Sequence, residues 1–487
     1  MKVLFATSEA APFIKSGGLG DVASALPKEL TKIKGAEVCV FLPYYKSIKN
    51  NPAFDIEYVT SFKVPLAWRS VYAGVFKAVI KSKGVGRNKR NDLTYYFIDN
   101  EYYFNRDGLY GFPDDGERFA YFCKAVLESI QYLDFVPDVI HCNDWQTGFI
   151  PLFLKALYSG AYKYDNIKTV FTIHNIEYQG KADPDFMDIV LGIDSSWTGV
   201  VMFDGFVNAM KSAIVLADKV TTVSRTYSHE IKYAYFAHGL ENILSENAYK
   251  LTGIVNGIDT LLYNPETDPT IPANFKPSDL SGKAVCKAEL QKRLGLEVNP
   301  DVPIVAMVTR LVAHKGMELV ERIGEEMMYN SNIQFVVLGT GDKRFEDYMH
   351  YLAYNYQGRV SANIMFDSKL ANMIYAGADL FLMPSKSEPC GLSQLIALRY
   401  GTIPVVRETG GRVDTVPHVN TTTLEGRGIT FKAFNAHDML DAVRRGVDLF
   451  YDKEKMAKFL PSIMRYDSSW KNPAAEYMGI YSEITGK

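Results

Sequence analysis

The sequence predicts an α/β protein with two doubly wound domains, each built on a mostly parallel sheet. Short runs rich in Val, Ile and Phe alternate with helical patterns, and each run ends in polar or small residues. The chain has 487 residues, which is long for one hydrophobic core. A proline-rich stretch separates two series of these runs, so we expect two domains.

The first series defines an N-terminal domain of residues 1–260. Two of its runs, 71–80 and 93–99, have no long helix between them and flank a polar turn at 83–92, so we predict an antiparallel insertion or edge there. The other predicted strands, which alternate with helical patterns, are 2–7, 37–42, 139–142, 168–173 and 219–223. A helical pattern at 22–30 follows the first strand.

The second series follows the segment 253–259 and a stretch with four prolines, and it defines a C-terminal domain of residues 261–464. Strands again alternate with helices, which is typical of a doubly wound fold. Its predicted strands are 303–309, 334–339, 380–384 and 403–407, and its predicted helices are 317–328, 343–356 and 392–400. Helical segments at 436–450 and 473–484 close the chain.

Composition excludes several classes of function. A formal net charge of −3 argues against a nucleic-acid backbone or an anionic membrane as the main partner. No secretory signal pattern and no run approaching the length of a membrane span is visible, so we expect a cytoplasmic protein. The cysteines are odd in number and form no CxxC pair, which predicts neither a disulfide framework nor a zinc module: Cys39, Cys123, Cys142, Cys286 and Cys390.

The glycine-rich segment 15–21, KSGGLGD, lies between the first strand and a helical pattern. Two Rossmann-like sheets present the carboxyl ends of their strands to a cleft, where open α/β sheets bind ligands. Backbone N–H groups at a helix N-terminus attract anions, and Lys15 adds a positive charge. We therefore interpret the segment as a phosphate-facing loop. The alternative is a purely geometric turn, because glycine tolerates close backbone approach.

Two cations follow the strand 303–309, in the segment RLVAHKG. Arg310 and Lys315 there concentrate positive potential near a helix N-terminus, which suits a diphosphate. The alternative is that Arg310 pairs with a carboxylate and Lys315 is solvated.

Glu388 precedes another helical pattern, in the segment SKSEPCGLSQL. The carboxylate could cap the helix, or it could accept hydrogen bonds from sugar hydroxyls and stabilise positive charge at an anomeric carbon. Cys390 lies at a position where a helix dipole favours a thiolate, but no His follows in the motif as a base. We therefore favour a packing or backbone role for Cys390.

Polar and aromatic residues follow two strands of the first domain, in the segments 141–146 and 174–175. This mixture predicts a sugar site, with Asp144 accepting hydroxyl hydrogen bonds and Trp145 offering a stacking face. A metal site is disfavoured because no HExxH or comparable ligand pair is present. His174 could also be a core histidine with its hydrogen bonds satisfied.

Taken together, these motifs resemble the glycogen and bacterial starch synthases, family 5 of the retaining glycosyltransferases. The resemblance covers nearly the whole chain. It implies the GT-B fold, with two Rossmann-like domains facing across a deep interdomain cleft, and a C-terminal helix at about 465–487 that crosses back onto the first domain. The most specific segments are KSGGLGDV (15–22), FTIHN (171–175), ADKVTTVS (217–224), GIVNGID (253–259), IYAGAD (374–379) and EPCGL (388–392).

The resemblance also implies roles for the matching residues. Arg310 and Lys315 would hold the diphosphate and neutralise the leaving group, Glu388 would bind the transferred glucose, and His174 would lie beside its 6-hydroxyl. Asp144 and Asn256 would line the glucose and acceptor side. The implied catalytic residues are Glu388, Arg310, Lys315 and His174. The implied donor-binding residues are Lys15, Gly17, Gly18, Asp21, Asn256, Tyr375, Cys390, Gly391, Leu392 and Thr409, and the implied acceptor-side residues are Asp144 and Trp145.

The implied reaction transfers glucose from ADP-glucose to the non-reducing-end 4-hydroxyl of an α-1,4-glucan or maltooligosaccharide, with retention and without a metal or cofactor. The alternatives are the same transfer from UDP-glucose and a non-catalytic glucan-binding GT-B protein, which would be expected to lose Lys15, Arg310, Lys315 or Glu388. A nicotinamide-dependent dehydrogenase is disfavoured, because the glycines at 17 and 18 are adjacent and the next strand lacks a terminal acid.

Several positions depart from the family pattern. Asn143 stands where His is frequent, Ser387 where an aromatic is common, Arg225 where Pro is usual and Arg412 where Leu is typical. Ile396 occupies the position of a second glutamate found in some other GT-B families. These departures concern acceptor and nucleotide contacts rather than the reaction class.

Overall fold

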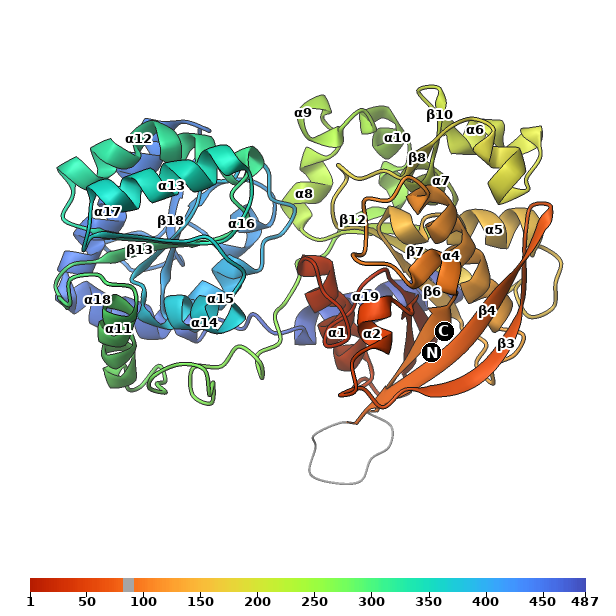
Figure 1. Ribbon diagram of the computed structural model, residues 1–487, viewed down its shortest axis with the longest axis horizontal. Coiled ribbons are helices and arrows are strands. Elements are labelled where there is room, and N and C mark those ends of the chain that lie inside the picture. Colours follow the sequence, from red (N-terminus) through yellow and green to blue (C-terminus); the bar gives the residue numbers. More distant parts are fainter. Residues whose placement is uncertain (82–91) are drawn as a thin grey trace. The chain divides into compact units, whose positions relative to one another are not determined.

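The computed structural model describes residues 1–81 and 92–487. The chain forms two compact units, one of Met1–Asn256 with Trp470–Lys487 and the other of Gly257–Ser469. Each unit is an α/β fold with a parallel-rich sheet covered by helices on both faces (Figure 1). The predicted pair of doubly wound α/β domains is confirmed.

The N-terminal unit is built on a mixed sheet with the strand order β12-β11-β7-β6-β1-β2-β5-β4-β3. The strands from β12 to β5 pair in parallel, whereas β3, β4 and β5 pair antiparallel. This confirms the predicted antiparallel edge, although most of its predicted polar turn lies outside the described residues. The strands are β1 (Lys2–Ala6), β2 (Glu37–Pro43), β3 (Glu57–Leu66), β4 (Arg69–Ile80), β5 (Leu93–Asp99), β6 (Val139–Asn143), β7 (Lys168–Ile173), β11 (Lys219–Thr222) and β12 (Leu251–Gly253).

Helices of the same unit cover this sheet. α1 and the C-terminal helix α19 contact one another, and α4, α5 and α7 form a second packed group. A small antiparallel sheet joins β8 (Lys181–Ala182), β10 (Phe206–Asn208) and β9 (Met202–Phe203). The helices are α1 (Gly18–Leu30), α2 (Lys46–Lys49), α3 (Glu101–Phe104), α4 (Asp115–Ser129), α5 (Phe149–Leu157), α6 (Thr198–Val201), α7 (Ala209–Leu216), α8 (Arg225–Glu230), α9 (Ala234–Ala237), α10 (Glu241–Glu246) and α19 (Lys471–Thr485).

The C-terminal unit has a parallel sheet in the order β15-β14-β13-β16-β17-β18. Its strands are β13 (Ile304–Val308), β14 (Gln334–Leu338), β15 (Val360–Asn363), β16 (Leu380–Met383), β17 (Ile403–Arg407) and β18 (Ile429–Phe431). Its helices are α11 (Ser281–Arg293), α12 (Met317–Asn330), α13 (Lys343–Asn355), α14 (Ser368–Gly377), α15 (Ser393–Arg399), α16 (Gly411–Thr415), α17 (Ala436–Tyr451) and α18 (Lys453–Met464).

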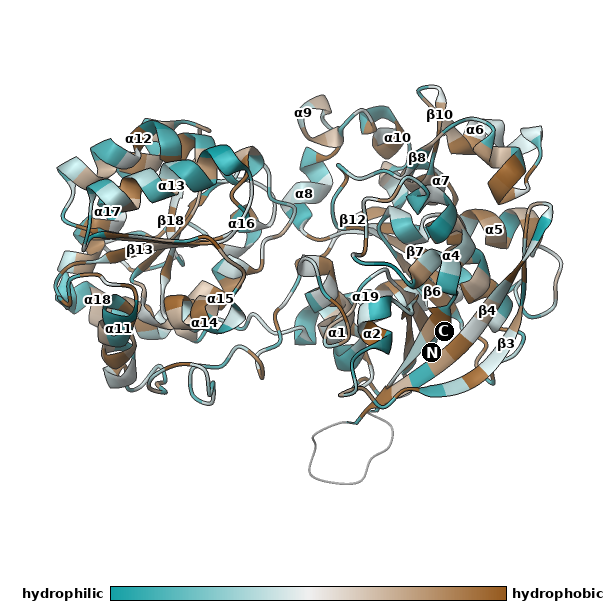
Figure 2. Cartoon of the chain, viewed as in Figure 1, coloured by the Kyte–Doolittle hydropathy of each residue, from teal (hydrophilic) through white to brown (hydrophobic). Residues whose placement is uncertain are grey.

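Side chains of the central strand β13 point alternately to the two faces of the sheet, which explains why the C-terminal unit has two hydrophobic cores. Val305 and Met307 pack with α12, α13 and α17 on one face, whereas Ile304 and Ala306 pack with α11, α14 and α15 on the other. Successive strand side chains point to opposite faces, so a strand covered on both sides must be apolar throughout. Figure 2 shows these strands in brown, with hydrophilic residues on the outer surfaces of the helices.

Several helices begin at a side-chain cap that the sequence supplies. Asn208, Ser224, Asp367 and Asn435 each accept a hydrogen bond from a backbone N–H in the first turn of α7, α8, α14 and α17. Such caps satisfy donors that a helix leaves unpaired. They fix the points at which strand ends turn into helices, where the candidate site residues lie.

Differences from the predicted elements are local. α1 begins at Gly18, four residues before the predicted start at 22, because the backbone is extended only up to Gly17. Several elements have no range in the sequence analysis, among them β3, β15, β18, α4, α11, α14 and α18. β15 and β18 are short, and the sequence of β15, VSAN, is partly polar. Among the described residues, no helix combines the length and apolarity that a membrane span requires.

Candidate active site

The glycine-rich loop of the N-terminal unit is held by a carboxylate that the sequence analysis missed. Glu9 follows β1, is only 4% exposed, and accepts hydrogen bonds from the backbone N–H groups of Ser16 and Gly17. Ser16 Oγ also donates to Glu9, at 3.0 Å. These two N–H groups therefore contact a carboxylate of the chain itself, and the approach of the loop to a phosphate stays a prediction.

Lys15 also has a partner in this structure. Its ammonium lies 2.6 Å from Asp21 Oδ2, and both side chains are partly exposed. Gly20 leaves room for the Lys15 side chain to reach Asp21, because a Cβ at position 20 would lie 2.9 Å from Lys15 Cγ. No side chain caps α1, so its first turn keeps the positive end of the helix dipole. Gly17 and Gly18 are exposed beside it.

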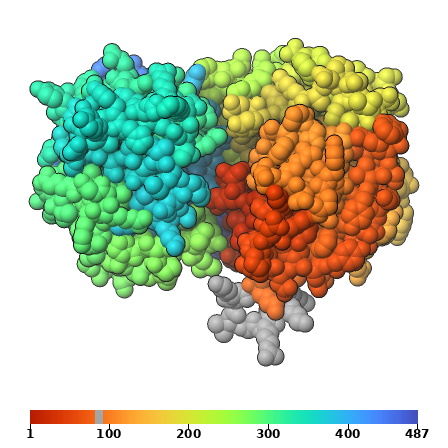
Figure 3. Space-filling view, viewed as in Figure 1, coloured from red at the N-terminus to blue at the C-terminus, as the bar shows by residue number. Residues whose placement is uncertain are grey.

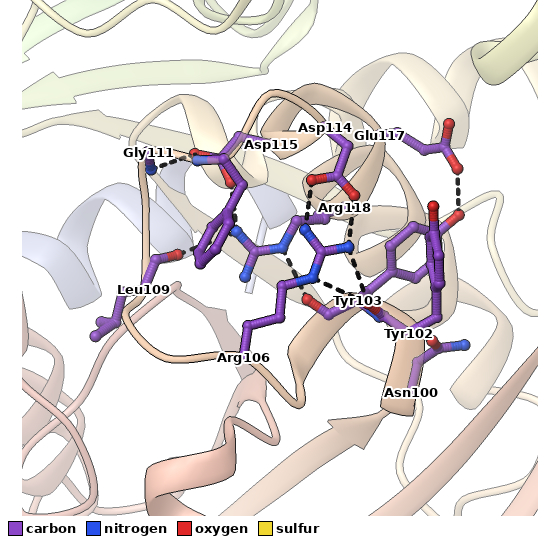
Figure 4. A network of polar contacts seen from close by, with 11 residues as sticks. Asn100, Tyr102, Tyr103, Arg106, Leu109, Gly111, Asp114, Asp115, Glu117 and Arg118 are labelled. Atoms are coloured by element: carbon purple, nitrogen blue, oxygen red, sulfur yellow. Dashed lines mark hydrogen bonds and ion pairs between the residues drawn. The ribbon is translucent and has the colours of Figure 1, made fainter.

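A polar network fixes the loop that supports Glu9. Tyr110 donates to Glu9 Oε1 at 3.1 Å and lies 2.7 Å from Ser8 Oγ. Two arginines hold the residues on either side of Tyr110 (Figure 4). Arg106 makes a bidentate pair with Asp114. The buried Arg118 donates to the Leu109 and Tyr103 carbonyls and pairs with Asp115. Figure 3 shows this orange-red part of the chain on the visible surface of its unit.

Asp144 and His174 lie together at the ends of β6 and β7. Asp144 Oδ1 accepts the backbone N–H groups of His174, at 2.7 Å, and of Asn175, at 3.2 Å. His174 Nε2 lies 2.8 Å from Asn143 Oδ1, so the residue that departs from the family pattern is a direct partner of this histidine. The φ of Asp144 is 56°, an unusual conformation for a non-glycine residue that is often found at functional sites.

Burial sets the charges of this pair. It raises the pKa of Asp144 to about 7, although the two backbone N–H groups favour the carboxylate. Burial lowers the pKa of His174 to about 3, so its imidazole is neutral near pH 7 and can donate or accept a hydrogen bond. Such a pair can bind hydroxyl groups. Among the described residues, no group of three or more His, Cys, Asp or Glu side chains has metal-binding geometry.

Trp145 and Asn256 were also predicted at this site. The Trp145 ring is half-buried against Phe119, with ring centroids 5.2 Å apart, and a Cβ at Gly180 would lie 2.3 Å from it. Its packing within the unit therefore covers part of the expected stacking face. Asn256 is buried, and its Oδ1 has no hydrogen-bond partner among the residues that the structure describes. A buried amide oxygen without a donor is available to a ligand hydroxyl.

In the C-terminal unit the structure brings Lys315 and Glu388 together. Lys315 Nζ lies 2.7 Å from Glu388 Oε2, and Arg412 Nη2 lies 2.8 Å from the same oxygen. Glu388 does not cap a helix: α15 begins at Ser393 without a side-chain cap. The alternative of a solvated Lys315 is not observed either, because its ammonium pairs with Glu388.

Glycines make this contact possible. β13 and β16 are neighbours in the sheet, so the turns that follow them are adjacent. Gly316 has φ 85°, and a Cβ there would lie 2.4 Å from the Pro384 carbonyl oxygen. The Lys386 N–H donates to the His314 carbonyl at 2.8 Å, which joins the two turns. The short 3₁₀ turn Ala313–Lys315 thereby presents Lys315 to Glu388.

The Glu388 carboxylate has two different oxygens. Oε2 takes the hydrogen bonds from Lys315 and Arg412, whereas Oε1 accepts none from the described residues. Burial opposes the charge of Glu388, but Lys315 and Arg412 outweigh it and lower its pKa to about 2. The group is therefore a permanent carboxylate with one oxygen left to bind a hydroxyl or to face a developing positive charge.

The remaining predicted residues of this unit divide into two groups. Arg310 is exposed and contacts His314 at 3.4 Å, and no carboxylate of the described residues pairs with it. The predicted backbone contributors Cys390, Gly391 and Leu392 lie directly before α15, and Thr409 is buried after β17. Tyr375, however, is only 4% exposed and packs against Phe381 in the core, which does not favour stacking on a nucleotide.

Comparisons with known proteins agree on one family. The model of the starch synthase catalytic domain matches residues 2–246, and that of glycosyl transferases group 1 matches residues 290–458. A glycogen synthase of Clostridium botulinum (strain Alaska E43 / Type E3) is 46% identical over 488 residues, covering 100% of both chains. A glycogen synthase of Geobacillus thermodenitrificans is 47% identical, covering 100% of this chain and 98% of its own.

Solved structures agree as well. The catalytic domain of starch synthase IV from Arabidopsis thaliana, bound to ADP and acarbose, superposes with a TM-score of 0.90 at 32% identity, covering 100% of this chain and 99% of its own. Sucrose-phosphate synthase from Thermosynechococcus elongatus superposes with a TM-score of 0.60 at 16% identity over 100% and 99% of the two chains, a likeness of fold alone. The two-domain fold is thus that of GT-B glycosyltransferases, and the chain belongs to the glycogen and starch synthase family of glycosyltransferases.

Proposed function

We propose that this protein is a glycogen synthase that transfers glucose from ADP-glucose to the non-reducing-end 4-hydroxyl of an α-1,4-glucan, with retention at the anomeric carbon. Full-length identity of 46% to curated glycogen synthases carries this proposal. The ADP and acarbose named for the starch synthase structure support an adenine nucleotide donor and a glucan acceptor.

The cations of the C-terminal unit would act on the leaving group. When the bond from the anomeric carbon to the diphosphate breaks, negative charge grows on the diphosphate and positive charge on the sugar ring. Arg310 and Lys315 would neutralise the first charge, and Glu388 Oε1 would bind the glucose and face the second. Interactions that strengthen as charge develops lower the barrier rather than only tightening binding.

The N-terminal unit would hold the other reacting groups. The neutral imidazole of His174 suits a contact with the glucose 6-hydroxyl, since it can form a hydrogen bond without adding charge. Asp144, Asn256 and Trp145 would line the acceptor side, and Lys15, with Gly17 and Gly18, would approach the distal phosphate. For Lys15 to do so, its ion pair with Asp21 must open. Retention would follow if a departing phosphate oxygen takes the proton of the acceptor hydroxyl on the same face.

A direct assay tests the proposal. The purified chain is incubated with radiolabelled ADP-glucose or UDP-glucose and a maltooligosaccharide, and the products are separated by length. We expect elongation by α-1,4-linked glucose, faster from ADP-glucose, and about 10²-fold slower with a Lys315→Ala control. Elongation from UDP-glucose alone would replace the donor assignment. Binding of the oligosaccharide without any elongation would favour a non-catalytic glucan-binding protein.

A further inference from the structure

Arg412 lies in an unusual position for an arginine, because its side chain is almost completely buried. Only 1% of the side chain is exposed. It comes from the first turn of α16, and its guanidinium donates to the Met383 carbonyl at 2.9 Å, to Ser385 Oγ at 2.9 Å and to Glu388 Oε2 at 2.8 Å. Nε is buried, and no described residue accepts a hydrogen bond from it. Burying a cation with an unsatisfied donor is costly, so its persistence calls for a function.

The backbone around Arg412 is built to bring it to Glu388. A Cβ at Gly410, which has φ 49°, would lie 1.9 Å from the Glu388 carbonyl oxygen, and a Cβ at Gly411 would lie 2.6 Å from Cys390 Cα. The Gly411 N–H also donates to the Pro389 carbonyl at 3.1 Å. The start of α16 therefore packs directly on the Glu388 segment, which fixes the guanidinium against the carboxylate.

Two cations share Glu388 Oε2, but they are held differently. Lys315 is 19% exposed and has a single flexible ammonium, whereas Arg412 is anchored by hydrogen bonds to three separate groups. A diphosphate bound at the same turn would attract Lys315 away from Glu388. It could not draw Arg412 away without breaking all of these bonds.

The charged groups around Glu388 come from several elements. Lys315 and His314 face it from the 3₁₀ turn that follows β13, and Arg412 faces it from α16. Burial and the positive charge of Arg407, at the end of β17, lower the pKa of Arg412. If Lys315 turned to a diphosphate in a chain with leucine at 412, the nearly buried carboxylate would have no cation in direct contact. Such a carboxylate takes up a proton.

We propose that Arg412 is a positioning residue that keeps Glu388 ionised and in place while Lys315 moves to the diphosphate of the donor. The proposal rests on the proposed glucosyl transfer. It gives the two cations separate tasks: Lys315 serves the leaving group, and Arg412 serves the carboxylate. It also gives a function to a residue that stands where leucine is typical of the family.

The test compares the pH dependence of kcat with that of kcat/KM for ADP-glucose in Arg412→Leu, Arg412→Gln and Arg412→Lys, between pH 5 and 9. The kcat profile reports groups in the enzyme–substrate complex, where Lys315 has moved, and the kcat/KM profile reports the free enzyme. In the Leu and Gln variants we expect an acid limb of kcat with a midpoint at about pH 7, inside the range measured, where the wild type shows none from Glu388. The rate at pH 6 relative to pH 8 then falls about tenfold, while kcat/KM shifts less. Arg412→Lys should keep the wild-type profile.

Arg427→Leu is the matched control. Arg427 Nε donates to the Thr415 carbonyl of the same helix at 2.7 Å, so this variant loosens α16 without removing a charge from Glu388. A folded Leu or Gln variant with the wild-type kcat profile would overturn the proposal, as would an equal shift in Arg427→Leu. If Leu does not fold, the Gln variant decides, because it keeps donors without the charge. Absence of transfer by the wild-type chain would instead refute the proposed function.

Discussion

Among the candidate site residues, we expect Lys315 to contribute most to stabilising the negative charge of the leaving group. We expect Lys315→Ala to lower kcat by about 10²-fold, comparable to losing one preorganised donor to a developing oxyanion, or roughly 3 kcal/mol. The fold should survive, because Arg412 still pairs with Glu388. Steady-state rates with ADP-glucose measure the effect.

Lys343→Ala is the control for that experiment. Lys343 is an exposed lysine of the same unit that pairs with Asp347 on its own helix. Its loss should leave kcat unchanged. A Lys315→Ala enzyme whose kcat matches the wild type would remove this residue from the chemistry.

His141 makes the stability of the N-terminal unit depend on pH. It is fully buried between Tyr481 Oη, at 2.7 Å, and Thr172 Oγ1, at 2.6 Å, and burial lowers its pKa from 6.5 to about 3. The unfolded chain therefore binds a proton that the folded chain rejects. This contribution to stability is complete above pH 6.5 and is lost as the pH falls from 6.5 towards 3.

We expect the free energy of unfolding to fall by about 1.4 kcal/mol from this residue between pH 7.5 and 5.5. His141→Gln should remove that part of the pH dependence, although the variant is less stable at both pH values. Urea unfolding at the two pH values measures it, with the exposed His437→Gln as control. An unchanged difference between the two pH values in His141→Gln would contradict the burial argument.

At the scale of elements, the loop before α1 depends on Glu9, a carboxylate outside the glycine-rich segment 15–21 that no sequence motif marks as its partner. Glu9→Gln would place an amide NH2 against the N–H groups of Ser16 and Gly17 or remove one of the two acceptors. We expect these amides to exchange hydrogen faster, and the KM for ADP-glucose to rise, because an unordered loop must be ordered on binding. Hydrogen–deuterium exchange of the peptide containing Ser16 measures the first effect.

Glu29→Gln is the matched control, since Glu29 pairs with Lys32 on the surface near the end of α1. It should change neither quantity. Equal exchange in Glu9→Gln and the wild type would mean that the loop is ordered without Glu9.

At the scale of the whole molecule, the last helix returns to the first unit. Trp470, Tyr477 and Tyr481 are each 3% exposed or less and pack within the N-terminal unit, where Tyr481 also meets His141. Deleting residues 470–487 should cost more than about 5 kcal/mol, because each large buried side chain contributes roughly 1.5–3 kcal/mol. That is a large part of a typical folding free energy.

We expect the shortened chain to be partly unfolded or to melt at least ~10 °C lower, since a kilocalorie shifts the midpoint of a large domain by about 2–4 °C. Differential scanning calorimetry measures this. Tyr481→Phe is the control, because it removes one hydroxyl and keeps the packing, and should cost only about 1 kcal/mol. Equal midpoints for the shortened and full-length chains would show that the helix packs without stabilising the unit.

Particular residues show which parts of the candidate site could be predicted from the sequence. The rule that ligands meet strand ends selected Lys315 and Glu388, and their segments do lie together because β13 and β16 are adjacent. Tyr375 is expected at the nucleotide from the family resemblance alone; its side chain packs against Phe381, and its contact with the donor stays a prediction. Arg412 was noticed as a departure from the family pattern, but its partner was not predictable. No local pattern connects positions 388 and 412.

The sequence by itself determined the alternation of apolar strands and helices, the antiparallel edge and the chemical types at the strand ends, because these depend on periodicity and short-range geometry. Only the tertiary structure decided which charges meet. Glu9 takes the N–H groups of the glycine-rich loop, and Glu388 receives both Lys315 and Arg412 on one oxygen. Such pairings depend on distances of a few ångströms between residues that no helix or strand periodicity links, and packing, rather than local sequence, sets those distances.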